Sequence, residues 1–307
     1  MANGAFPQTL RVAAGHSSGS PIPLYTMTDM GLAAAIPGFD LRPLEDAFQR
    51  APHDVRPAHR HDFFKVGLVT AGRGLLSADF TDYPIRPPML LQFAPGVVHA
   101  WRPSQLPRGF VINFERKFIA ADSRGQAGDV EAPIFCLRFG PKALPIAPQQ
   151  RSLFEGLAQA MLREARTRGT DHDAALRSYL RLWLIEAGRI AEARQPARWN
   201  DRGTALTNRF LCLVSRQFRS FSAVSEYAAR LQVTASHLNE TVRRTLGKTA
   251  GQVIRERIVL EAQRLLRHSD LSVSEIAYHL EFDDPSYFAR FFRKHTGQPP
   301  AQFRSQA

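Results

Sequence analysis

The sequence predicts an α+β protein, in which a β-barrel domain carrying a helical hairpin is followed by an all-α domain. Short β-branched and aromatic runs broken by Gly and Pro fill residues 39–139, and apolar residues recur at helical spacing beyond residue 148. Near the C-terminus the same short sequence pattern occurs twice. A chain of 307 residues with 44% hydrophobic content can bury two cores.

We predict four segments from composition and periodicity. Residues 1–37, rich in Gly, Ser, Pro and Ala, are expected to form an irregular N-terminal arm. Residues 38–193 form the first domain, residues 194–203 interrupt the periodicity and form a linker, and residues 204–307 form the second domain.

The first domain is expected to begin with strands and to end with two helices. The predicted strands are Phe63 to Thr70, Gly74 to Phe80, Met89 to Phe93, Gly109 to Phe114 and Ile134 to Phe139. Between Leu153 and Ile190, apolar residues at helical spacing predict an antiparallel helical hairpin. The hairpin could pack on the barrel and carry a dimer interface, or serve this domain alone.

The second domain contains a duplicated unit. Val224–Ala228 returns as Val273–Ala277 at an offset of 49 residues, and Leu238–Gly247 returns as Phe288–Gly297 at an offset of 50. Each copy reads as a helix, a tight turn and a second helix.

The second copy shows where its helices begin. Ser272 with Glu275 predicts a capping box, which satisfies backbone donors at a helix start. Asp284 can cap the next helix and Pro285 suits its first position. This helix should run to about His295 and bury Phe288 and Phe292, which completes a helix-turn-helix unit.

An amphipathic helix is predicted between the copies, over Gly251–Arg267. Its buried stripe consists of Ile254, Ile258, Ala262, Leu265 and Leu266. About 16 residues rise roughly 25 Å, and we expect this spacer to hold the two second helices on the order of 34 Å apart. That distance is about one turn of B-DNA, so each helix could enter its own major groove.

Residues 204–306 resemble the DNA-binding domain of the AraC/XylS family of transcription regulators. The resemblance depends on Ile276-Ala277, Phe282-Asp283-Asp284, Ser286-Tyr287-Phe288, Arg290, Phe292-Arg293-Lys294, Thr296-Gly297, Pro299-Pro300 and Phe303-Arg304. The chain departs from the family at Glu281, where Gly is usual in the turn, and Gln232 is the corresponding residue of the first copy. A left-handed backbone at a non-glycine would cost roughly 1 kcal/mol.

The resemblance implies which residues touch DNA. The expected base contacts are Ser236, Asn239, Glu240, Ser286, Ala289 and Arg290, and the expected phosphate contacts are Arg243, Arg244, Arg293 and Lys294. Asn suits adenine, Glu suits cytosine, and Arg290 is the best guanine reader. The four basic residues could instead be solvated cations that favour the C-terminal end of a helix.

Composition agrees with a polyanionic partner inside the cell. Lys and Arg number 40 against 28 Asp and Glu, which gives a net charge of +12. Cys136 and Cys212 have no partners at a metal-ligand spacing, which favours a reducing cytoplasm. No apolar run approaches about 18 residues, so neither export nor membrane insertion is expected.

The first domain carries motifs similar to those of the cupin barrels. His59-Arg60-His61 with Gly72 matches the first motif, although Lys65 replaces its Glu, and Pro95-Gly96 with His99 matches a shortened second motif. Because side chains alternate along a strand, each set should line one face. The resulting pocket would contain His59, His61, Phe63, Lys65, His99 and Trp101.

This pocket is expected to hold a small aromatic or otherwise apolar carboxylic acid. A buried Lys65 needs a counter-charge, which a ligand carboxylate or else Asp62 or Asp82 could provide. Three histidines could bind zinc or iron, or they could be structural, but a cation at Lys65 would repel a metal ion. We therefore predict no metal, no cofactor and no catalytic residue.

The resemblance implies a sequence-specific DNA-binding transcription regulator. We expect a cytoplasmic homodimer that activates a promoter together with RNA polymerase and responds to the effector. The alternatives are a metal-binding cupin sensor or enzyme joined to a DNA-binding domain, and a DNA-binding protein without sequence preference or ligand.

Overall fold

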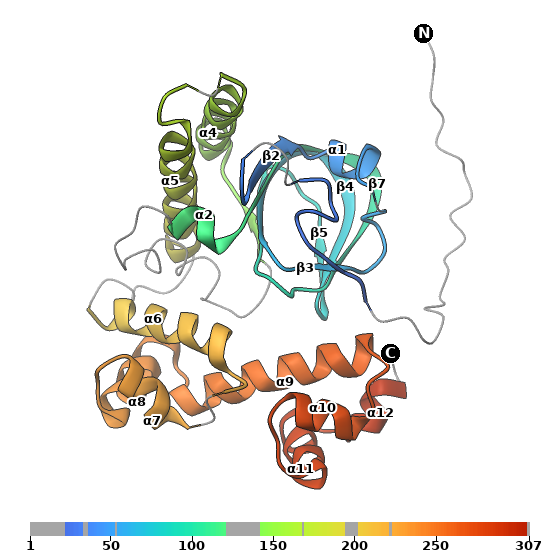
Figure 1. Ribbon diagram of the computed structural model, residues 1–307, viewed down its shortest axis with the longest axis vertical. Helices are drawn as coiled ribbons and strands as arrows, with labels where there is room; N and C mark the ends of the chain where they lie inside the picture. Colours follow the sequence, from blue (N-terminus) through green and yellow to red (C-terminus); the bar gives the residue numbers. More distant parts are fainter. Residues whose placement is uncertain are drawn as a thin grey trace.

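A computed structural model describes residues 22–32, 36–52, 54–120, 142–167, 169–193, 202–220 and 223–305. A β-rich half packs above an all-helical half, and the long helix α9 runs along the boundary between them (Figure 1). Among the described residues, no helix combines the length and apolar character that a membrane crossing requires.

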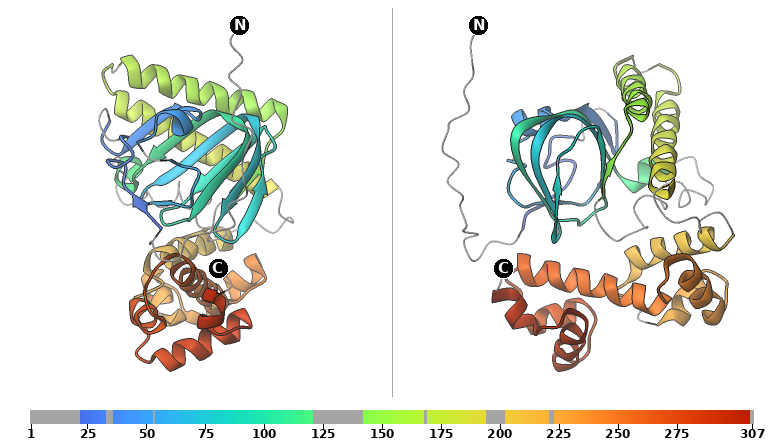
Figure 2. Two further views of the ribbon diagram at one scale, coloured as in Figure 1. Left: turned by 90° about the vertical axis from the view of Figure 1, so that its right-hand side faces the viewer. Right: turned by 180° about the vertical axis from the view of Figure 1, so that it is seen from behind.

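The N-terminal half is built on a curled antiparallel sheet. Its strands are β2 (Phe39–Pro43), β4 (Phe64–Ala78), β5 (Thr81–Pro84), β6 (Met89–Phe93), β7 (His99–Phe114) and β8 (Lys142–Pro145). They pair in the order β2-β7-β4-β6-β8, with β5 on β4. The short strands β1 (Leu24–Tyr25) and β3 (Arg60–His61) form a separate parallel pair. Pairing among the described strands does not close the sheet into the barrel that we expected, although its curl encloses a core (Figure 2).

One long strand replaces two of the predicted ones. Phe63–Thr70 and Gly74–Phe80 belong largely to β4, whose pairing with β7 shifts register between Val69 and Gly74. Gly72 allows this irregularity: its φ is 115°, and a Cβ there would lie 2.6 Å from the Cα of Pro107. The predicted strand Met89–Phe93 is β6. The predicted strand Ile134–Phe139 lies outside the described residues.

The helices of this half are α1 (Asp46–Gln49), α2 (Arg116–Ala120), α4 (Pro148–Thr167) and α5 (His172–Ala193). Helices α4 and α5 form the expected hairpin and pack on the sheet, where Phe154 and Trp183 share one apolar cluster with Val66, Leu68 and Leu90. The Phe154 and Trp183 rings meet edge to face, with centroids 4.8 Å apart.

The helical half contains two helix-turn-helix units on one core. Its helices are α6 (Arg202–Gln217), α7 (Val224–Arg230), α8 (Ala235–Leu246), α9 (Ala250–His268), α10 (Val273–His279), α11 (Pro285–Thr296) and α12 (Pro300–Ser305). All five residues of the stripe predicted for α9 are buried. They join residues of both units in one continuous apolar cluster, so the spacer is part of the core and is not a free rod.

Part of the segment that we expected to be an irregular arm is packed. Strand β1 pairs with β3, and Met27, Met30 and Leu32 are buried. The Ile22 amide donates to the His268 carbonyl at 3.0 Å, so this segment also meets the end of α9. Residues 1–21 lie outside the described part of the chain, and α6 begins at Arg202, inside the predicted linker.

Candidate nucleic-acid interface and effector site

Helices α8 and α11 are held at both ends in the same way. The Thr234 hydroxyl accepts from the His237 amide at 3.1 Å, and the Asp284 carboxylate accepts from the Ser286 and Tyr287 amides at 2.8 and 3.0 Å. Each helix ends at a glycine in the left-handed region, with φ of 72° at Gly247 and 82° at Gly297.

The predicted DNA contacts lie on the outer faces of these helices. Leu238 and Val242, and likewise Phe288 and Phe292, face the core. Opposite them, the exposed predicted residues are Ser236, Glu240, Arg243, Arg244, Ser286, Arg290, Arg293 and Lys294, and the half-buried ones are Asn239 and Ala289. The outer faces of α8 and α11 are therefore accessible to DNA, and the individual contacts with DNA stay predictions.

Asn239 and Arg290 differ in their freedom to read a base. The Asn239 Oδ1 accepts from the Ala250 amide at 3.0 Å, which ties it to the start of α9. Reading adenine needs both atoms of the Asn amide, so Asn239 would have to give up or share this bond. The Arg290 side chain is 71% exposed and lies 3.8 Å from the Asp284 carboxylate.

In the turn of each unit, a residue that is not glycine adopts the left-handed backbone conformation. Gln232 has a φ of 58° and Glu281 a φ of 62°, both left-handed. Glycine takes this region freely, whereas other residues are strained by roughly 1 kcal/mol. The departure from the family pattern therefore carries a local energetic cost in both copies.

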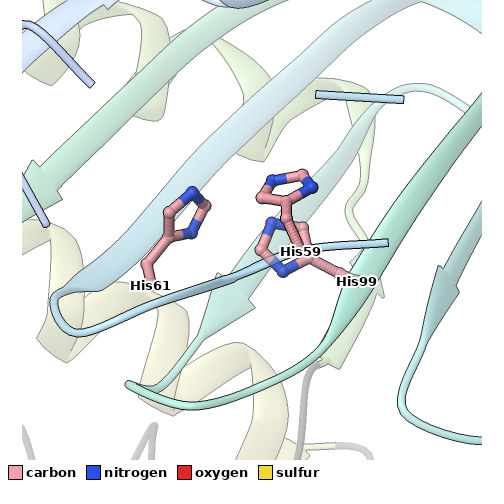
Figure 3. Close-up of side chains that lie close together, drawn as sticks. All are labelled: His59, His61 and His99. Atoms are coloured by element: carbon pink, nitrogen blue, oxygen red, sulfur yellow. The ribbon is translucent and has the colours of Figure 1, made fainter. Parts of the chain in front are cut away.

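Three predicted histidines meet inside the β-rich half. The rings of His59, His61 and His99 are at most 2% exposed, and their centroids lie 4.3 to 4.9 Å apart (Figure 3). His59 and His99 face each other across an isolated bridge, in which each amide donates to the carbonyl of the other at 3.0 and 2.8 Å.

Burial keeps these imidazoles neutral. Desolvation, followed by the nearby charge of Lys65, lowers the pKa of His59 to about 4 and holds the pKa of His61 far below its usual range. Desolvation, followed by His59 and Lys65, likewise holds the pKa of His99 well below its ordinary value.

Lys65 is a second perturbed group beside the histidines. Its Nζ lies 3.5 Å from the His61 Nε2. Burial lowers the pKa of Lys65 to about 7, although the charge of Asp40 acts in the opposite direction. Asp40 itself pairs with Arg42 at 2.6 Å and accepts from the side-chain Nδ2 of Asn113 at 3.1 Å. Because Asp40 already bonds to Arg42 and Asn113, it balances the positive charge of Lys65 only in part.

A small cavity of about 20 Å³, enough for about one water molecule, lies next to this group. Its lining consists of Leu44, Ala47, Phe48, Val55, Lys65, Gly67, Leu91, Phe93, Trp101 and Val111. The structure thus brings Lys65 and Trp101 together, as predicted. Phe93 lines the cavity and stacks on His99, with centroids 4.4 Å apart, and none of the three histidines is in the lining.

The side chains of His59, His61, Phe63 and Lys65 contact one another in series, as expected, but of these four only Lys65 lines the cavity. The chain bends at Asp62 and Phe63, between β3 and β4. Phe63 stacks on His61 and is buried in a cluster with Met27, Met30, Leu32 and Val55, and of these five residues only Val55 lines the cavity.

The suggested partners of Lys65 also need correction. Asp62 is exposed, and Asp82 pairs with Arg102 at 3.0 Å. The carboxylate whose charge acts on Lys65 is Asp40, on β2. Sequence reasoning missed Asp40, Phe48 and Phe93. The strand prediction for residues 89–93 was the one signal that could have placed Phe93 on an inward face.

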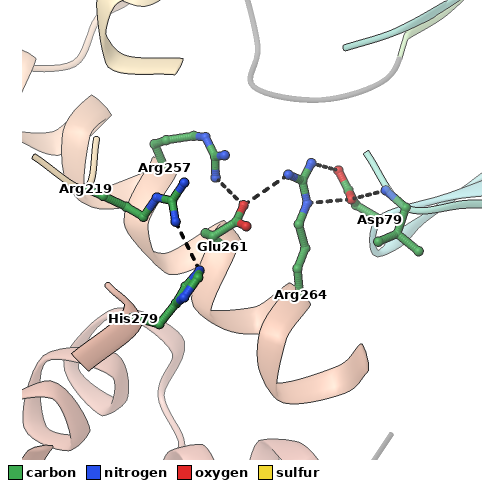
Figure 4. A network of polar contacts seen from close by, with 7 residues as sticks. Asp79, Arg219, Arg257, Glu261, Arg264 and His279 are labelled. Carbon is green, nitrogen blue, oxygen red and sulfur yellow. Dashed lines mark hydrogen bonds and ion pairs between the residues drawn. The ribbon is translucent and has the colours of Figure 1, made fainter. Parts of the chain in front are cut away.

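A buried ion pair joins the two halves. The Arg264 Nε and Nη2 on α9 donate to the two carboxylate oxygens of Asp79, in the β4–β5 turn, at 2.8 and 2.7 Å (Figure 4). Their side chains are 4% and 7% exposed. Asp79 is also tied to Val98, because its amide donates to the Val98 carbonyl at 2.7 Å and its Oδ1 accepts from the Val98 amide at 3.3 Å.

The pair continues along α9 toward the first helix-turn-helix unit. Glu261 accepts from Arg264 at 3.3 Å and from Arg257 at 2.9 Å, and the Arg257 guanidinium lies 3.9 Å over the Phe218 ring. Beside it, Arg219 and His279 approach to 3.1 Å (Figure 4). Asp79 and Arg264 are 185 residues apart in the chain, so their contact could not be predicted from a local sequence pattern.

Comparison with known protein families accounts for both halves. The AraC-like ligand binding domain matches residues 44–189, and a helix-turn-helix domain family matches residues 227–306. The chain belongs to the AraC/XylS family of transcription regulators. It is therefore a DNA-binding regulator with an N-terminal ligand-binding domain.

Relatives of this AraC/XylS-family regulator include proteins named HTH-type transcriptional activator RhaR. The one from Cronobacter sakazakii is 35% identical over 83 residues, which are 27% of this chain and 29% of that protein. The one from Escherichia coli O139:H28 is 24% identical over 265 residues, which are 83% of this chain and 89% of that protein. These relatives are named as regulators of transcription, not as enzymes.

Among solved structures, the chain is similar to ToxT of Vibrio cholerae with a bound unsaturated fatty acid. The two are 11% identical, with a TM-score of 0.36, over 89% of this chain and 97% of ToxT.

Proposed function

We propose that the protein activates transcription by inserting α8 and α11 into successive major grooves of promoter DNA, in response to a small carboxylic acid in the β-rich half. The observation that carries the DNA-binding part is the pair of exposed helices at the two ends of α9, joined through one core. The 19 residues of α9 rise about 28 Å. This rise supports a groove spacing of one DNA turn.

The effector is proposed from the chemistry of the cavity. A carboxylate beside Lys65 would supply the charge that Asp40, already engaged with Arg42, supplies only in part. Trp101 and Phe93 in the lining offer surfaces to a ring. A small aromatic or otherwise apolar carboxylic acid satisfies both demands, and the side chains that line the small cavity must move apart to admit it.

The signal is proposed to travel through the ion pair between the halves. Trp101 lines the cavity and lies on β7, and the segment that leads into this strand contains Val98. Val98 is bonded to Asp79, and Asp79 holds Arg264 on α9. A ligand that shifts the start of β7 would therefore act on the helix that positions both recognition helices.

Assembly follows from the same proposal. On α5, Leu182 is 41% exposed and Ile185 is 42% exposed, and they lie one helical turn apart. This apolar face supports a homodimer formed through the hairpin, which would act with RNA polymerase at a promoter in the cytoplasm. The proposal assigns no catalytic activity to the chain.

Footprinting tests the DNA-binding part. On DNA from upstream of its own coding gene, the full chain should protect two successive major grooves on one face of the duplex. Random duplex of the same length should bind at least roughly 1,000-fold more weakly at physiological salt. Protection of a single groove, or equal affinity for random DNA, would contradict the proposal.

Calorimetric titration with a panel of aromatic and apolar carboxylic acids tests the effector. Lys65→Ala should weaken binding at least roughly tenfold, because it removes a charged hydrogen-bond donor. Lys117→Ala, which removes an exposed cation paired with Glu115, is the matched control and should bind normally. Equal binding by both variants would remove the carboxylate hypothesis.

Asp79→Asn tests the route of the signal. The variant should bind the acid normally, but the acid should no longer change its affinity for DNA. Asp82→Asn alters the neighbouring pair with Arg102, inside the β-rich half, and should retain the response. An undiminished response in Asp79→Asn would exclude this route.

A further inference from the structure

The three buried histidines form a geometry that the effector cavity does not use. One ring nitrogen from each of His59, His61 and His99 can be chosen so that all three atoms lie within 4.8 Å of one another. The rings come from two separate segments that the His59–His99 bridge fixes to each other through the backbone. None of the three residues lines the cavity beside Lys65.

Backbone carbonyls fix the tautomer of two of these rings. The His59 Nδ1 lies 2.8 Å from the Pro57 carbonyl oxygen, and the His99 Nδ1 lies 3.1 Å from the Val97 carbonyl oxygen. A carbonyl oxygen accepts only, so each Nδ1 must carry the hydrogen. Each Nε2 then carries a lone pair.

Those two Nε2 atoms are buried, and among the described residues neither meets a hydrogen-bond partner. Leaving a buried acceptor unsatisfied costs roughly 1–3 kcal/mol. A neutral histidine with one nitrogen bonded to a carbonyl and a free lone pair on the other is the arrangement that ligand histidines of metal sites show. The unsatisfied atoms therefore point to an electron-pair acceptor between the rings.

We propose that His59, His61 and His99 together bind one divalent first-row transition metal ion, either zinc or ferrous iron. Neutral imidazoles suit these ions, and three of them leave a coordination position open. The geometry outweighs the sequence-based expectation of no metal, which depended on Lys65. Lys65 borders the metal site, because its Nζ lies 3.5 Å from the His61 Nε2, and its side chain also lines the effector cavity.

Metal analysis of the purified full-length protein, with any affinity tag removed, tests the proposal. After incubation with zinc or anaerobic ferrous iron and removal of free metal, mass spectrometry should find one ion per chain. His99→Ala should bind at least roughly 100-fold more weakly. The control is His172→Ala, which removes a histidine beside Asp173 at the start of α5 and should retain the metal.

A measurement on the unaltered chain guards against a variant that fails to fold. Cobalt should give the visible absorption of a nitrogen-ligated tetrahedral ion, and zinc should displace it. Absence of bound metal in the wild type, or equal binding by His99→Ala and wild type, would overturn the proposal, and the histidines would then be structural. Because the metal site does not depend on the proposed effector or DNA contacts, its failure would leave both intact.

Discussion

The two helix-turn-helix units have similar backbone conformations but differ in how the N-terminus of their first helix is capped. In the second unit, Ser272 and Glu275 form a reciprocal capping box. In the first unit, Glu226 accepts from the Ala223 amide at 2.7 Å, but Ala223 has no side-chain acceptor to return the bond. The turns nevertheless match, with φ of 58° at Gln232 and 62° at Glu281.

They differ again on the surface that faces a partner. The first unit presents Asn239, whose oxygen is occupied by the Ala250 amide, and the second presents Arg290, which is largely exposed. The shared core and turn preserve the geometry, while outward residues are free to differ because no packing constrains them. This difference predicts that the second unit reads sequence more sharply and that the first depends more on α9.

Removing an aromatic core residue of the second unit should have the largest effect. Phe288→Ala leaves a cavity in the cluster shared by both units and should lower the free energy of unfolding by about 3–5 kcal/mol. Urea unfolding followed by hydrogen exchange should show α8 and α11 losing protection together. If α8 kept its protection, the two units would fold independently.

Substitutions at Arg290, at Asn239 and at the predicted phosphate contacts should affect DNA affinity and sequence specificity differently. Arg290→Ala should cost about 1–3 kcal/mol of binding and relax specificity at one base pair. Arg293→Ala should weaken binding to all sequences and reduce the salt slope by about one unit. Asn239→Ala should lower stability and weaken binding on every sequence, because it frees the Ala250 amide. A base-specific loss in Asn239→Ala would reverse our ranking of the units.

Acid should loosen the spacer between the units through Glu261. Burial alone would raise the pKa of this carboxyl, but Arg257 and Arg264 hold it below its ordinary 4.5. Since the pKa is lower in the folded state, the stabilisation is complete above about pH 4.5 and is lost as the pH falls through the folded value. Glu261→Gln should therefore show a shallower loss of stability than wild type between roughly pH 5 and 3. Parallel curves would show that the network contributes no pH dependence.

The strained turns should give the smallest effect. Gln232→Gly and Glu281→Gly relieve a left-handed backbone but increase the freedom of the unfolded chain, so each should raise the free energy of unfolding by less than about 1 kcal/mol. Thermal unfolding should show similar increments for both. A gain in one turn alone would mean that the two backbones are strained to different degrees.

Much of the helical half could be predicted because its signals are local. The capping box at Ser272, Pro285 at the first position of α11 and the apolar stripe of α9 each lie within a few helical turns, where period and cap chemistry determine structure. The order of strands and the bend at Asp62 and Phe63 are not encoded in this way. They result from pairing between distant segments, which is why the sequence did not show that only Lys65 of the four predicted residues from His59 to Lys65 lines the cavity.

The sequence by itself determined the family, the duplicated unit and the outward residues of α8 and α11, because helical periodicity sorts exposed from buried positions without knowledge of a partner. Only the tertiary structure decided that Lys65 lies near Asp40, that three histidines turn their nitrogens toward one another and that Asp79 holds Arg264. Each of these contacts joins side chains whose positions depend on how the sheet curls or how the two halves meet. Neither the curl of the sheet nor the packing of the two halves can be predicted from residue spacing along the chain.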